Sequence, residues 1–225
     1  MSTKPLVIAI DGPAGAGKST ASNALANELG INCLDTGALF RAFALKAMRN
    51  GADCKDAAAV VAAIEGTDLK IEVSSGTQRT ILDGEDVSSL IRTPACAQGA
   101  SDIGTIPRVR EILTEQVREI AKTISLVVDG RDVGTAMLPN ANFKFFLTAT
   151  PQERARRRHL ENVAKGDDTP YEEVLQQIIH RDEVDSTRKI APLKQAEDAI
   201  VIDSTDMNPA QVLEMMLKTI LEKNR

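Results

Sequence analysis

The segment IDGPAGAGKST, residues 10–20, crowds small residues ahead of one lysine and two hydroxyl groups. It fits the pattern G-x-x-x-x-G-K-[ST], in which a glycine-rich loop surrounds phosphate groups. A Val- and Ile-rich run over residues 5–11 precedes it and is typical of a strand buried on both faces. A helical pattern over residues 18–29 follows and ends at Gly30. With these flanks, the segment predicts a phosphate-binding loop rather than a glycine-rich turn without a ligand.

The residue types of this loop explain how it can hold a triphosphate. Small side chains let backbone N–H groups converge on an anion, and glycine permits a positive φ where the loop curls. The start of the following helix adds about half a positive charge. We expect Lys18 to reach the β- and γ-phosphates of ATP and Ser19 to hold Mg²⁺. The predicted nucleotide-binding loop residues are Gly12, Pro13, Ala14, Gly15, Ala16, Gly17, Lys18, Ser19 and Thr20.

Further apolar runs and helical patterns alternate along the chain. Strands are predicted at residues 31–35, 125–130, 142–149 and 199–205. Helices are predicted at residues 37–49, 56–64, 94–103, 107–123, 151–165, 170–184 and 209–223. Because strands and helices alternate, we predict one α/β domain of the phosphate-loop NTPase type, doubly wound around a five-stranded parallel sheet.

One region has a different pattern. Residues 69–74 and 79–83 alternate apolar and polar side chains, and the turn-forming stretches SGTQ (75–78) and DGED (83–86) follow them. This alternation predicts antiparallel strands with one face in water. The strands form either a small inserted sheet, which we favour, or a hairpin at the edge of the main sheet.

Composition excludes several classes of protein. Among the 225 residues, aromatic side chains make up only 3% and the formal net charge is −5, so neither base-stacking platforms nor a general polyanion-binding surface is expected. Cys33, Cys54 and Cys96 have no metal-ligand spacing and predict buried thiols. No apolar run reaches the ~20 residues that span a bilayer, and no signal peptide is apparent. We therefore expect a cytoplasmic monomer without nucleic-acid or membrane partners.

A phosphate-binding loop alone does not define the reaction. The guanine-reading motif N-K-x-D is missing, which argues against a GTPase and leaves small kinases. Such a kinase needs a second anion site at the carboxyl ends of the strands. Arginines follow strands there in LDTGALFR (34–41) and DGRDVGT (129–135), and again in HRDEVDSTRKIAPL (180–193). A planar guanidinium binds phosphate with two hydrogen bonds, although the last stretch alone would be interpreted as a solvated charge run.

These stretches, together with IPRVRE (106–111), resemble the bacterial cytidylate kinase family of nucleoside monophosphate kinases from about residue 6 to residue 205. The resemblance implies that ATP and CMP or dCMP react to give ADP and CDP or dCDP, with Mg²⁺. It implies a core of about residues 1–36, 104–150 and 178–225, a monophosphate-binding region of about 37–103, and a lid of about 151–177.

The resemblance also implies a role for individual residues. Cytosine offers an N4 amino donor where uracil offers an O4 acceptor, so a carboxylate can tell the two apart. The implied cytosine-reading residues are Ser101, Arg110 and Asp132, and the implied ribose contacts are Arg181 and Asp185. The residues implied to hold the acceptor phosphate or the transferring phosphoryl group are Arg41, Arg131 and Arg188.

Two further assignments keep an alternative open. Asp129 ends an apolar strand, where a carboxylate either steadies Mg²⁺ or is purely structural. We place it with Lys18, Arg131 and Arg188 in the expected catalytic set. In ERARRRH (153–159), the arginines form either a solvated helix face or part of a lid over the nucleotide phosphates. The resemblance favours Arg157 and Arg158 as lid residues.

The chain departs from the family pattern LDSGAIYR at two substrate-binding positions. Thr36 stands where the pattern has serine, and Phe40 where it has tyrosine. The missing phenol predicts an acceptor affinity weaker by about 1 kcal/mol, the net value of one hydrogen bond. Two other functions stay open: a kinase for another small acceptor, and a nucleotide-dependent protein that binds RNA.

Overall fold

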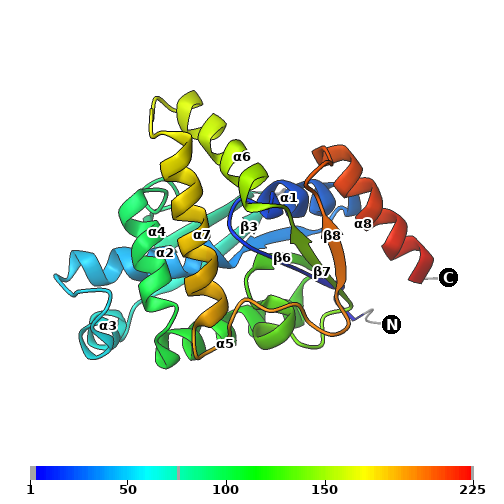
Figure 1. Cartoon of the computed structure of the whole chain (residues 1–225). Coiled ribbons are helices and arrows are strands. Elements are labelled where there is room, and N and C mark those ends of the chain that lie inside the picture. Colours follow the sequence, from blue (N-terminus) through cyan, green and yellow to red (C-terminus); the bar gives the residue numbers. More distant parts are fainter. Residues whose placement is uncertain (1–3, 75–76, 224–225) are drawn as a thin grey trace.

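A five-stranded parallel sheet forms the centre of the molecule, which we describe from a computed structural model covering residues 4–74 and 77–223 (Figure 1). Its strand order is β2-β6-β1-β7-β8. The strands are β1 (Val7–Asp11), β2 (Asn32–Asp35), β6 (Leu126–Gly130), β7 (Phe143–Thr148) and β8 (Ile200–Asp203). Every neighbouring pair is parallel, which confirms the predicted α/β fold.

Alternation along β1 divides the core into two layers. Ile8 and Ile10 pack with residues of α1 (Lys18–Leu29) and α8 (Pro209–Lys223). Ala9 points to the other face and packs with residues of α2 (Thr36–Arg49) and α5 (Pro107–Thr123). All three strand side chains are fully buried, as the continuous apolar run predicts. In Figure 1, α1 lies above the strands, α8 lies to their right beside β8, and α5 lies below them.

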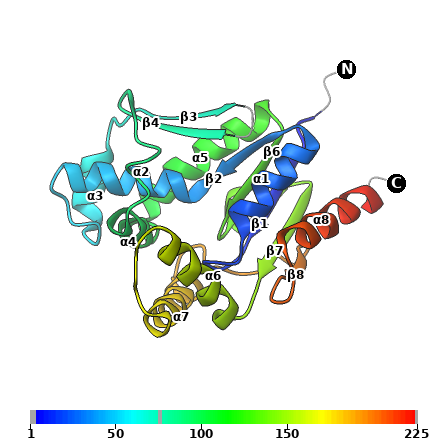
Figure 2. The same cartoon turned by 90° about the horizontal axis from the view of Figure 1, so that it is seen from above.

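The remaining helices pack on α2 or on one another. They are α3 (Ala57–Ile64), α4 (Pro94–Ile103), α6 (Pro151–Ala164) and α7 (Tyr171–Thr187). Helices α6 and α7 pack side by side and project together beyond the sheet (Figures 1 and 2). All the predicted helices are present, and α7 extends three residues past its expected end.

A short π-helix, η1 (Val133–Met137), follows β6 and has no sequence pattern that predicts it. Its first N–H groups, those of Val133 and Gly134, each donate a 2.7 Å hydrogen bond to the buried carboxylate of Asp11. A carboxylate at the end of β1 therefore fixes the chain that leaves β6. This contact places Arg131 and Asp132 at the carboxyl edge of the sheet.

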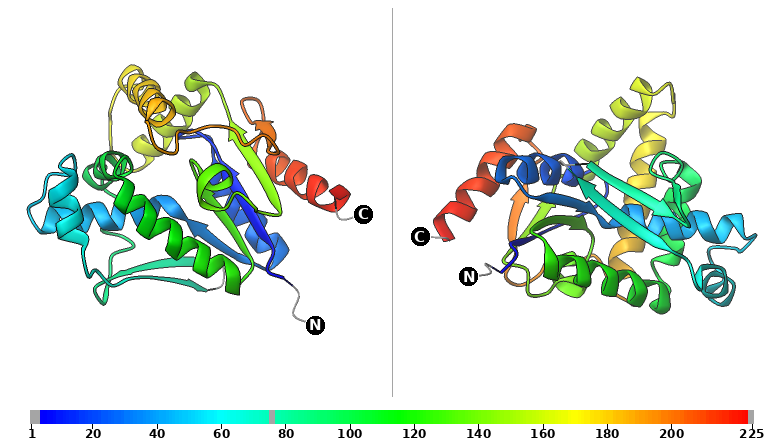
Figure 3. Two further views of the ribbon diagram at one scale, coloured as in Figure 1. Left: turned by 90° about the horizontal axis from the view of Figure 1, so that it is seen from below. Right: turned by 180° about the vertical axis from the view of Figure 1, so that it is seen from behind.

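The alternating region forms a separate antiparallel sheet, as Figure 3 shows beside the main sheet. Its strands are β3 (Leu69–Ser74), β4 (Thr77–Leu82) and β5 (Glu85–Asp86). The turn predicted by DGED is present, with Asp83 at φ 50° and Gly84 at φ 84°. The turn predicted by SGTQ (75–78) is wrong at Thr77 and Gln78, which belong to β4, and residues 75 and 76 lie outside the described residues. The predicted inserted sheet is confirmed, and the alternative of an edge hairpin is wrong.

The side chain of Gln78 ties this small sheet to the main one. Its Oε1 accepts a 2.7 Å hydrogen bond from the backbone N–H of Asp35, and its Nε2 lies 3.4 Å from the carbonyl oxygen of the same residue. Asp35 ends β2 and caps α2 by accepting from the N–H of Ala38. Gln78 thus acts as a substitute strand neighbour at the point where β2 ends.

Replacing Gln78 with alanine is expected to lower the free energy of unfolding by about 1–2 kcal/mol, because the Asp35 N–H loses its partner. For a chain of this size, each 1 kcal/mol lowers the melting temperature by about 2–4 °C. Thermal denaturation followed by circular dichroism measures the change. Arg79→Ala, at an exposed neighbouring position with two surface ion pairs, is the matched control and should shift the melting temperature much less. Equal shifts for both variants would contradict this role of Gln78.

Other expectations concern cysteines and membranes. Cys33, Cys54 and Cys96 are buried free thiols, as predicted. Within residues 4–74 and 77–223, no helix combines the length and apolar character needed to cross a bilayer.

Candidate active site

The loop between β1 and α1 has the shape needed to approach an anion closely. Gly12 has φ 151°, and a Cβ there would lie 1.9 Å from the carbonyl oxygen of Leu147. Gly17 precedes α1 in the left-handed conformation, with φ 86° and no side-chain cap on the helix. The first N–H groups of α1 therefore keep their capacity to bind an anion.

Lys18 lies inside this loop. Its side chain is buried, and Nζ donates a 2.7 Å hydrogen bond to the carbonyl oxygen of Pro13. Burial, reinforced by the charge of Arg131, lowers the pKa of Lys18 to about 7. A phosphate bound to the loop would restore a full positive charge by supplying the missing counter-charge.

Ser19 and Asp129 meet beside the loop, at the start of α1 and near the end of β6. Ser19 Oγ donates a 2.9 Å hydrogen bond to Asp129 Oδ2. Asp129 is 3% exposed, and its Oδ1 is buried without a hydrogen-bond partner. Burial, and then the charge of Asp35, raise the pKa of Asp129 to about 7. Two adjacent oxygen donors, one with an unused acceptor atom, fit a hard cation such as Mg²⁺.

The predicted acceptor residues include Asp132, which follows β6. Asp132 accepts a hydrogen bond from Arg110 Nη2 and a second one, 3.0 Å long, from Arg188 Nη2. All three side chains are buried or nearly so. Arg110 lies on α5, 22 residues before Asp132, and Arg188 directly follows α7, 56 residues after Asp132. The fold therefore assembles a carboxylate held between two guanidinium groups.

A second carboxylate, Asp185 of α7, continues this network. Its Oδ2 accepts hydrogen bonds from Arg131 Nε at 3.0 Å and Arg181 Nε at 3.3 Å, and its Oδ1 lies 4.0 Å from Arg188 Nη1. Burial alone would raise the pKa of Asp185, but Arg131 and Arg181 hold it below its ordinary value. Burial also lowers the pKa of Arg188, despite Asp132 beside it. Both predicted ribose residues and two of the three predicted phosphate residues, Arg131 and Arg188, thus lie in one connected cluster.

The four other predicted acceptor residues discussed here lie on α2 and α4. Thr36 Oγ1 is buried and donates 2.8 Å to the carbonyl oxygen of Asp129, so its hydroxyl has a structural partner. Arg41 pairs with Asp35 at 2.7 Å, and its Nε is buried without a partner. Ser101 is buried on α4. The Phe40 ring faces the guanidinium of Arg110, 5.4 Å from the ring centroid, and supports that arginine by a cation–π contact.

The two predicted lid arginines differ in their surroundings. Arg157 donates hydrogen bonds to Ser204 Oγ at 3.1 Å and to the Ser204 carbonyl oxygen at 2.6 Å. Its Nη1 also lies near Gly17, at 4.0 Å from the position of a Cβ built on that glycine. The Arg158 side chain is 54% exposed and pairs with Glu161 at 3.4 Å. The structure brings Arg157, but not Arg158, to the phosphate loop.

Some residues of the site are not among those predicted from the sequence. Asp11 fixes η1, Gln78 holds the end of β2, and Arg154 joins α6 to both the phosphate loop and Asp182. For Arg154 a signal existed, because ERARRRH places it on one helical face with Arg157 and Arg158. The sequence analysis places Gln78 in the turn-forming stretch SGTQ, and nothing in that stretch indicates its contact with Asp35.

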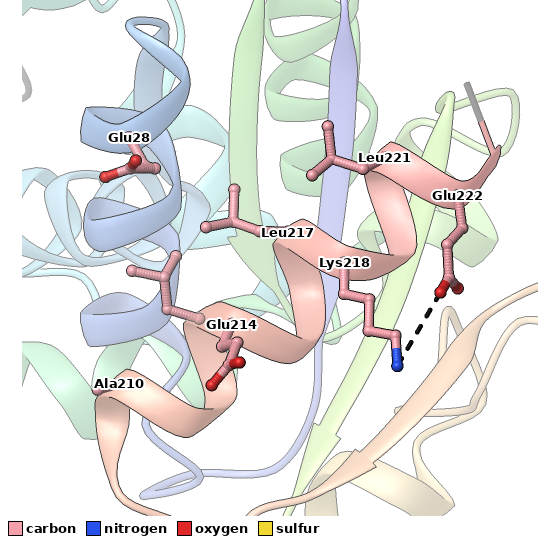
Figure 4. Close-up of a pocket in the computed structure, with 8 residues that line it drawn as sticks. Glu28, Ala210, Glu214, Leu217, Lys218, Leu221 and Glu222 are labelled. Carbon is pink, nitrogen blue, oxygen red and sulfur yellow. Dashed lines mark ion pairs between the residues drawn. The ribbon is translucent and has the colours of Figure 1, made fainter. Parts of the chain in front are cut away.

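A hollow away from this cluster lies between α1 and α8 (Figure 4). Leu217 and Leu221 line it together with Glu28, near the carboxyl-terminal end of α1. The phosphate loop joins the opposite end of that helix, about 15 Å away at 1.5 Å per residue. The hollow therefore belongs to a different surface.

Comparisons with known proteins point to one family. The family model of cytidylate kinase matches residues 8–222. A cytidylate kinase from Caldicellulosiruptor bescii is 49% identical over 215 residues, which are 96% of this chain and 95% of that protein. Cytidylate kinases from Lactiplantibacillus plantarum and Mycobacterium leprae are each 44% identical, covering 99% and 97% of this chain and 98% and 97% of their own lengths.

Solved structures share the fold at low sequence identity. A gluconokinase from Sinorhizobium meliloti has a TM-score of 0.50 at 15% identity, with 99% of this chain and 96% of that chain covered. An uncharacterized protein from Eubacterium ventriosum has a TM-score of 0.53 at 11% identity, with 96% and 98% covered. Both neighbours share the overall α/β fold of this chain.

Proposed function

Because this chain belongs to the cytidylate kinase family, we propose how its own residues divide the work of phosphoryl transfer from ATP to CMP or dCMP. The enzyme is a phosphotransferase, and its substrates are small nucleotides. Of the functions left open by the sequence, family membership favours the nucleoside monophosphate kinase over a kinase for another acceptor and over an RNA-binding protein. The observation that carries the proposal is the buried carboxylate of Asp132 between Arg110 and Arg188.

On the donor side, the loop of residues 12–20 binds the phosphates of ATP. The N–H groups at the start of α1 face the anion, and Lys18 exchanges its hydrogen bond with Pro13 for the β- and γ-phosphates. Arg157 covers the nucleotide from α6, close to Gly17. We keep Arg158 as a lid residue that would have to turn inward on closure.

Ser19 and Asp129 are the residues that would hold Mg²⁺. The unused Oδ1 of Asp129 and the hydroxyl of Ser19 offer the oxygen donors that this ion prefers. No group of three or more His, Cys, Asp or Glu side chains suited to a metal occurs in the described ranges. Mg²⁺ is usually coordinated by one or two protein groups together with the phosphates of the substrate. When bound, Mg²⁺ would neutralise charge on the β- and γ-phosphates.

On the acceptor side, Asp132 and Arg110 read the cytosine together with Ser101. A carboxylate accepts a hydrogen bond from the N4 amino group of cytosine and is repelled by O4 of uracil. Arg181 and Asp185 contact the ribose. Arg41, Arg131 and Arg188 hold the acceptor phosphate, and Thr36 and Phe40 shape the floor of this site. The chain's own arginines thus surround both phosphates with positive charge.

The chemistry then depends on position rather than on covalent catalysis. The acceptor phosphate is an anionic nucleophile near neutral pH, since its second pKa is about 6, so no general base is needed. Arg131 and Arg188 compensate the charge of the moving phosphoryl group between the two nucleotides. Carboxylates orient both arginines before substrate binds, so little reorganisation remains.

We further propose the division of the chain that the resemblance implies. Residues 1–36, 104–150 and 178–225 form the core, residues 37–103 the monophosphate-binding region with its small sheet, and residues 151–177 the lid. The enzyme acts as a monomer in the cytoplasm.

The direct test measures ADP release with ATP and Mg²⁺ against CMP, dCMP, UMP, AMP, GMP and shikimate. We expect turnover with CMP and dCMP to exceed that with each other acceptor by at least about 10-fold, the value of one specific base contact. Equal turnover with UMP would contradict the role of Asp132. Turnover with shikimate alone would overturn the acceptor assignment.

Phe40→Tyr tests the departure from the family pattern. We expect a KM for CMP lowered up to about 5-fold, because a restored phenol adds about 1 kcal/mol of hydrogen bonding. The ring stays in place beside Arg110, so kcat should change little. Phe40→Leu removes the ring and should raise KM, since Arg110 loses its cation–π partner. Steady-state kinetics with varied CMP measure both variants, and an unchanged KM in both would contradict the contact.

A further inference from the structure

Arg154 has surroundings that the assignments above do not use. Its side chain is 4% exposed on α6 and makes hydrogen bonds to three separate segments. Nε donates 2.8 Å to the carbonyl oxygen of Ala149, and Nη1 donates 3.0 Å to the carbonyl oxygen of Ala14 in the phosphate loop. Both Nη atoms donate to the two carboxylate oxygens of Asp182, at 3.0 and 2.6 Å.

These partners belong to the two halves of the active site. Ala14 lies in the loop that binds the donor, and the next residue, Gly15, is so close that a Cβ there would lie 3.2 Å from Arg154 Cβ. Asp182 lies on α7, directly after Arg181 and one turn before Asp185. One guanidinium therefore joins the donor loop to the helix that carries the ribose-binding pair.

The packing around α6 and α7 gives this link its importance. Ala155, Val174 and Ile178 form a small apolar cluster between the two helices, separate from the two clusters that flank the main sheet. Helices α6 and α7 thus have a small core of their own, and their described residues do not belong to either of the two larger clusters. The hydrogen bonds of Arg154 to Ala14 and Asp182 can then determine the position of α7 relative to the phosphate loop. A buried ion pair is weak evidence for stability alone, because desolvation offsets its attraction.

We propose that Arg154 is a positioning residue that couples the donor site to the acceptor site. Because its guanidinium bonds both Ala14 and Asp182, a shift of the phosphate loop moves Asp182 and, with it, Arg181 and Asp185 on the same helix. ATP bound in the loop would favour the arrangement of α7 that binds CMP, and CMP would favour ATP by the same factor. The inference rests on the proposed function, since it takes ATP and CMP as the ligands.

The test is a pair of calorimetric titrations of the full chain with CMP, without and with a saturating β,γ-imido analogue of ATP and Mg²⁺. The ratio of the two dissociation constants measures the coupling. For the wild-type chain we expect a ratio of at least about 5. Arg154→Lys keeps the charge, but one ammonium cannot hold both Asp182 oxygens and the Ala14 carbonyl. We expect its ratio to fall below about 2, while CMP alone binds within about 3-fold of wild type.

Two further variants make the result specific. Asp182→Asn leaves the arginine in place but weakens its fork, so its ratio should also fall, and it carries the test if Arg154→Lys does not fold. Combined with Arg154→Lys it should add little, because the two residues act as one unit. Arg156→Lys, at an exposed position on the same helix, is the matched control and should keep the wild-type ratio.

The outcomes separate this inference from the proposed function. A wild-type ratio near 1, or an Arg154→Lys ratio equal to that of the wild type, overturns the coupling even where the variant melts at a lower temperature. If the wild-type chain phosphorylates CMP in either case, the proposed function stands without the coupling. If the wild-type chain neither binds nor phosphorylates CMP, the proposed function fails first.

Discussion

Asp132→Asn is expected to lower kcat/KM for CMP by about 100-fold and to reduce the preference for CMP over UMP by about 10- to 100-fold. Asp132 is a buried carboxylate held between Arg110 and Arg188. Arg110 and Arg188 donate to different oxygens of Asp132, and an amide replaces one of these oxygens with an NH₂ group, so one arginine loses its acceptor. The NH₂ group can donate to O4 of uracil, which the carboxylate repels. Affinity for the correct base and discrimination against the wrong one should therefore fall together.

The loss should appear in kcat as well as in KM, because Asp132 also orients Arg188. Arg188 Nη2 donates 3.0 Å to Asp132 Oδ1, and its Nε donates 2.6 Å to the carbonyl oxygen of Ala191. Without the carboxylate, one of these two hydrogen bonds is lost, and Asp185, 4.0 Å away, is left as the nearby carboxylate of a buried guanidinium. Preorganised charge near the moving phosphoryl group then decreases.

The measurement is initial rates with CMP and with UMP over a range of concentrations, together with a thermal melt to show that the variant is folded. Asp86→Asn, at an exposed carboxylate of the small sheet, is the control and should leave both ratios unchanged. A CMP-to-UMP preference that stays within 3-fold of wild type would remove Asp132 from base recognition. That result would place its role in orienting Arg188 alone.

The sequence predicts the bounds of helices well where a glycine or a proline stands at the helix end. Gly30 ends α1, and proline opens α4, α5 and α8, so these helices match their predicted bounds. Apolar runs identify the strands but carry no information on sheet order, in which β6 lies between β2 and β1. η1 is likewise hidden, because its cause is Asp11, 122 residues earlier in the chain.

The candidate site shows the same division between local and distant causes. The phosphate loop is recognised from eight consecutive residues, 12–19, because its chemistry is local. Arginine partners depend on contacts such as that between Arg188 and Asp132, which no helical or strand period indicates. In ERARRRH, spacing alone cannot tell the buried Arg154 from the largely exposed Arg158. Burial is set by how α6 meets the loop and α7, which is a tertiary property.

Lys18→Met is expected to lower kcat by about 10³-fold or more while raising the melting temperature by about 2–4 °C. The activity is lost because the ammonium contacts the phosphates where charge develops in the transition state. The stability gain follows from the cost of the same charge in the free enzyme. Lys18 is 6% exposed, and its pKa is lowered, so the folded chain holds the proton less well than the unfolded chain does. Methionine has a similar volume and carries no charge to bury.

This result would separate a functional cost from a structural one. At neutral pH the protonated ammonium destabilises the folded state, since its folded pKa of about 7 lies below the ordinary value of 10.5. The net gain stays near 1 kcal/mol, because the carbonyl oxygen of Pro13 loses its donor. Calorimetric melts and ADP-release rates measure the two effects, with Lys218→Met on the exposed face of α8 as the control for both. A variant that melts below wild type would show that Lys18 stabilises the empty loop. In that case the hydrogen bond from Lys18 to Pro13 would contribute more to the stability of the fold than burial of the charge costs.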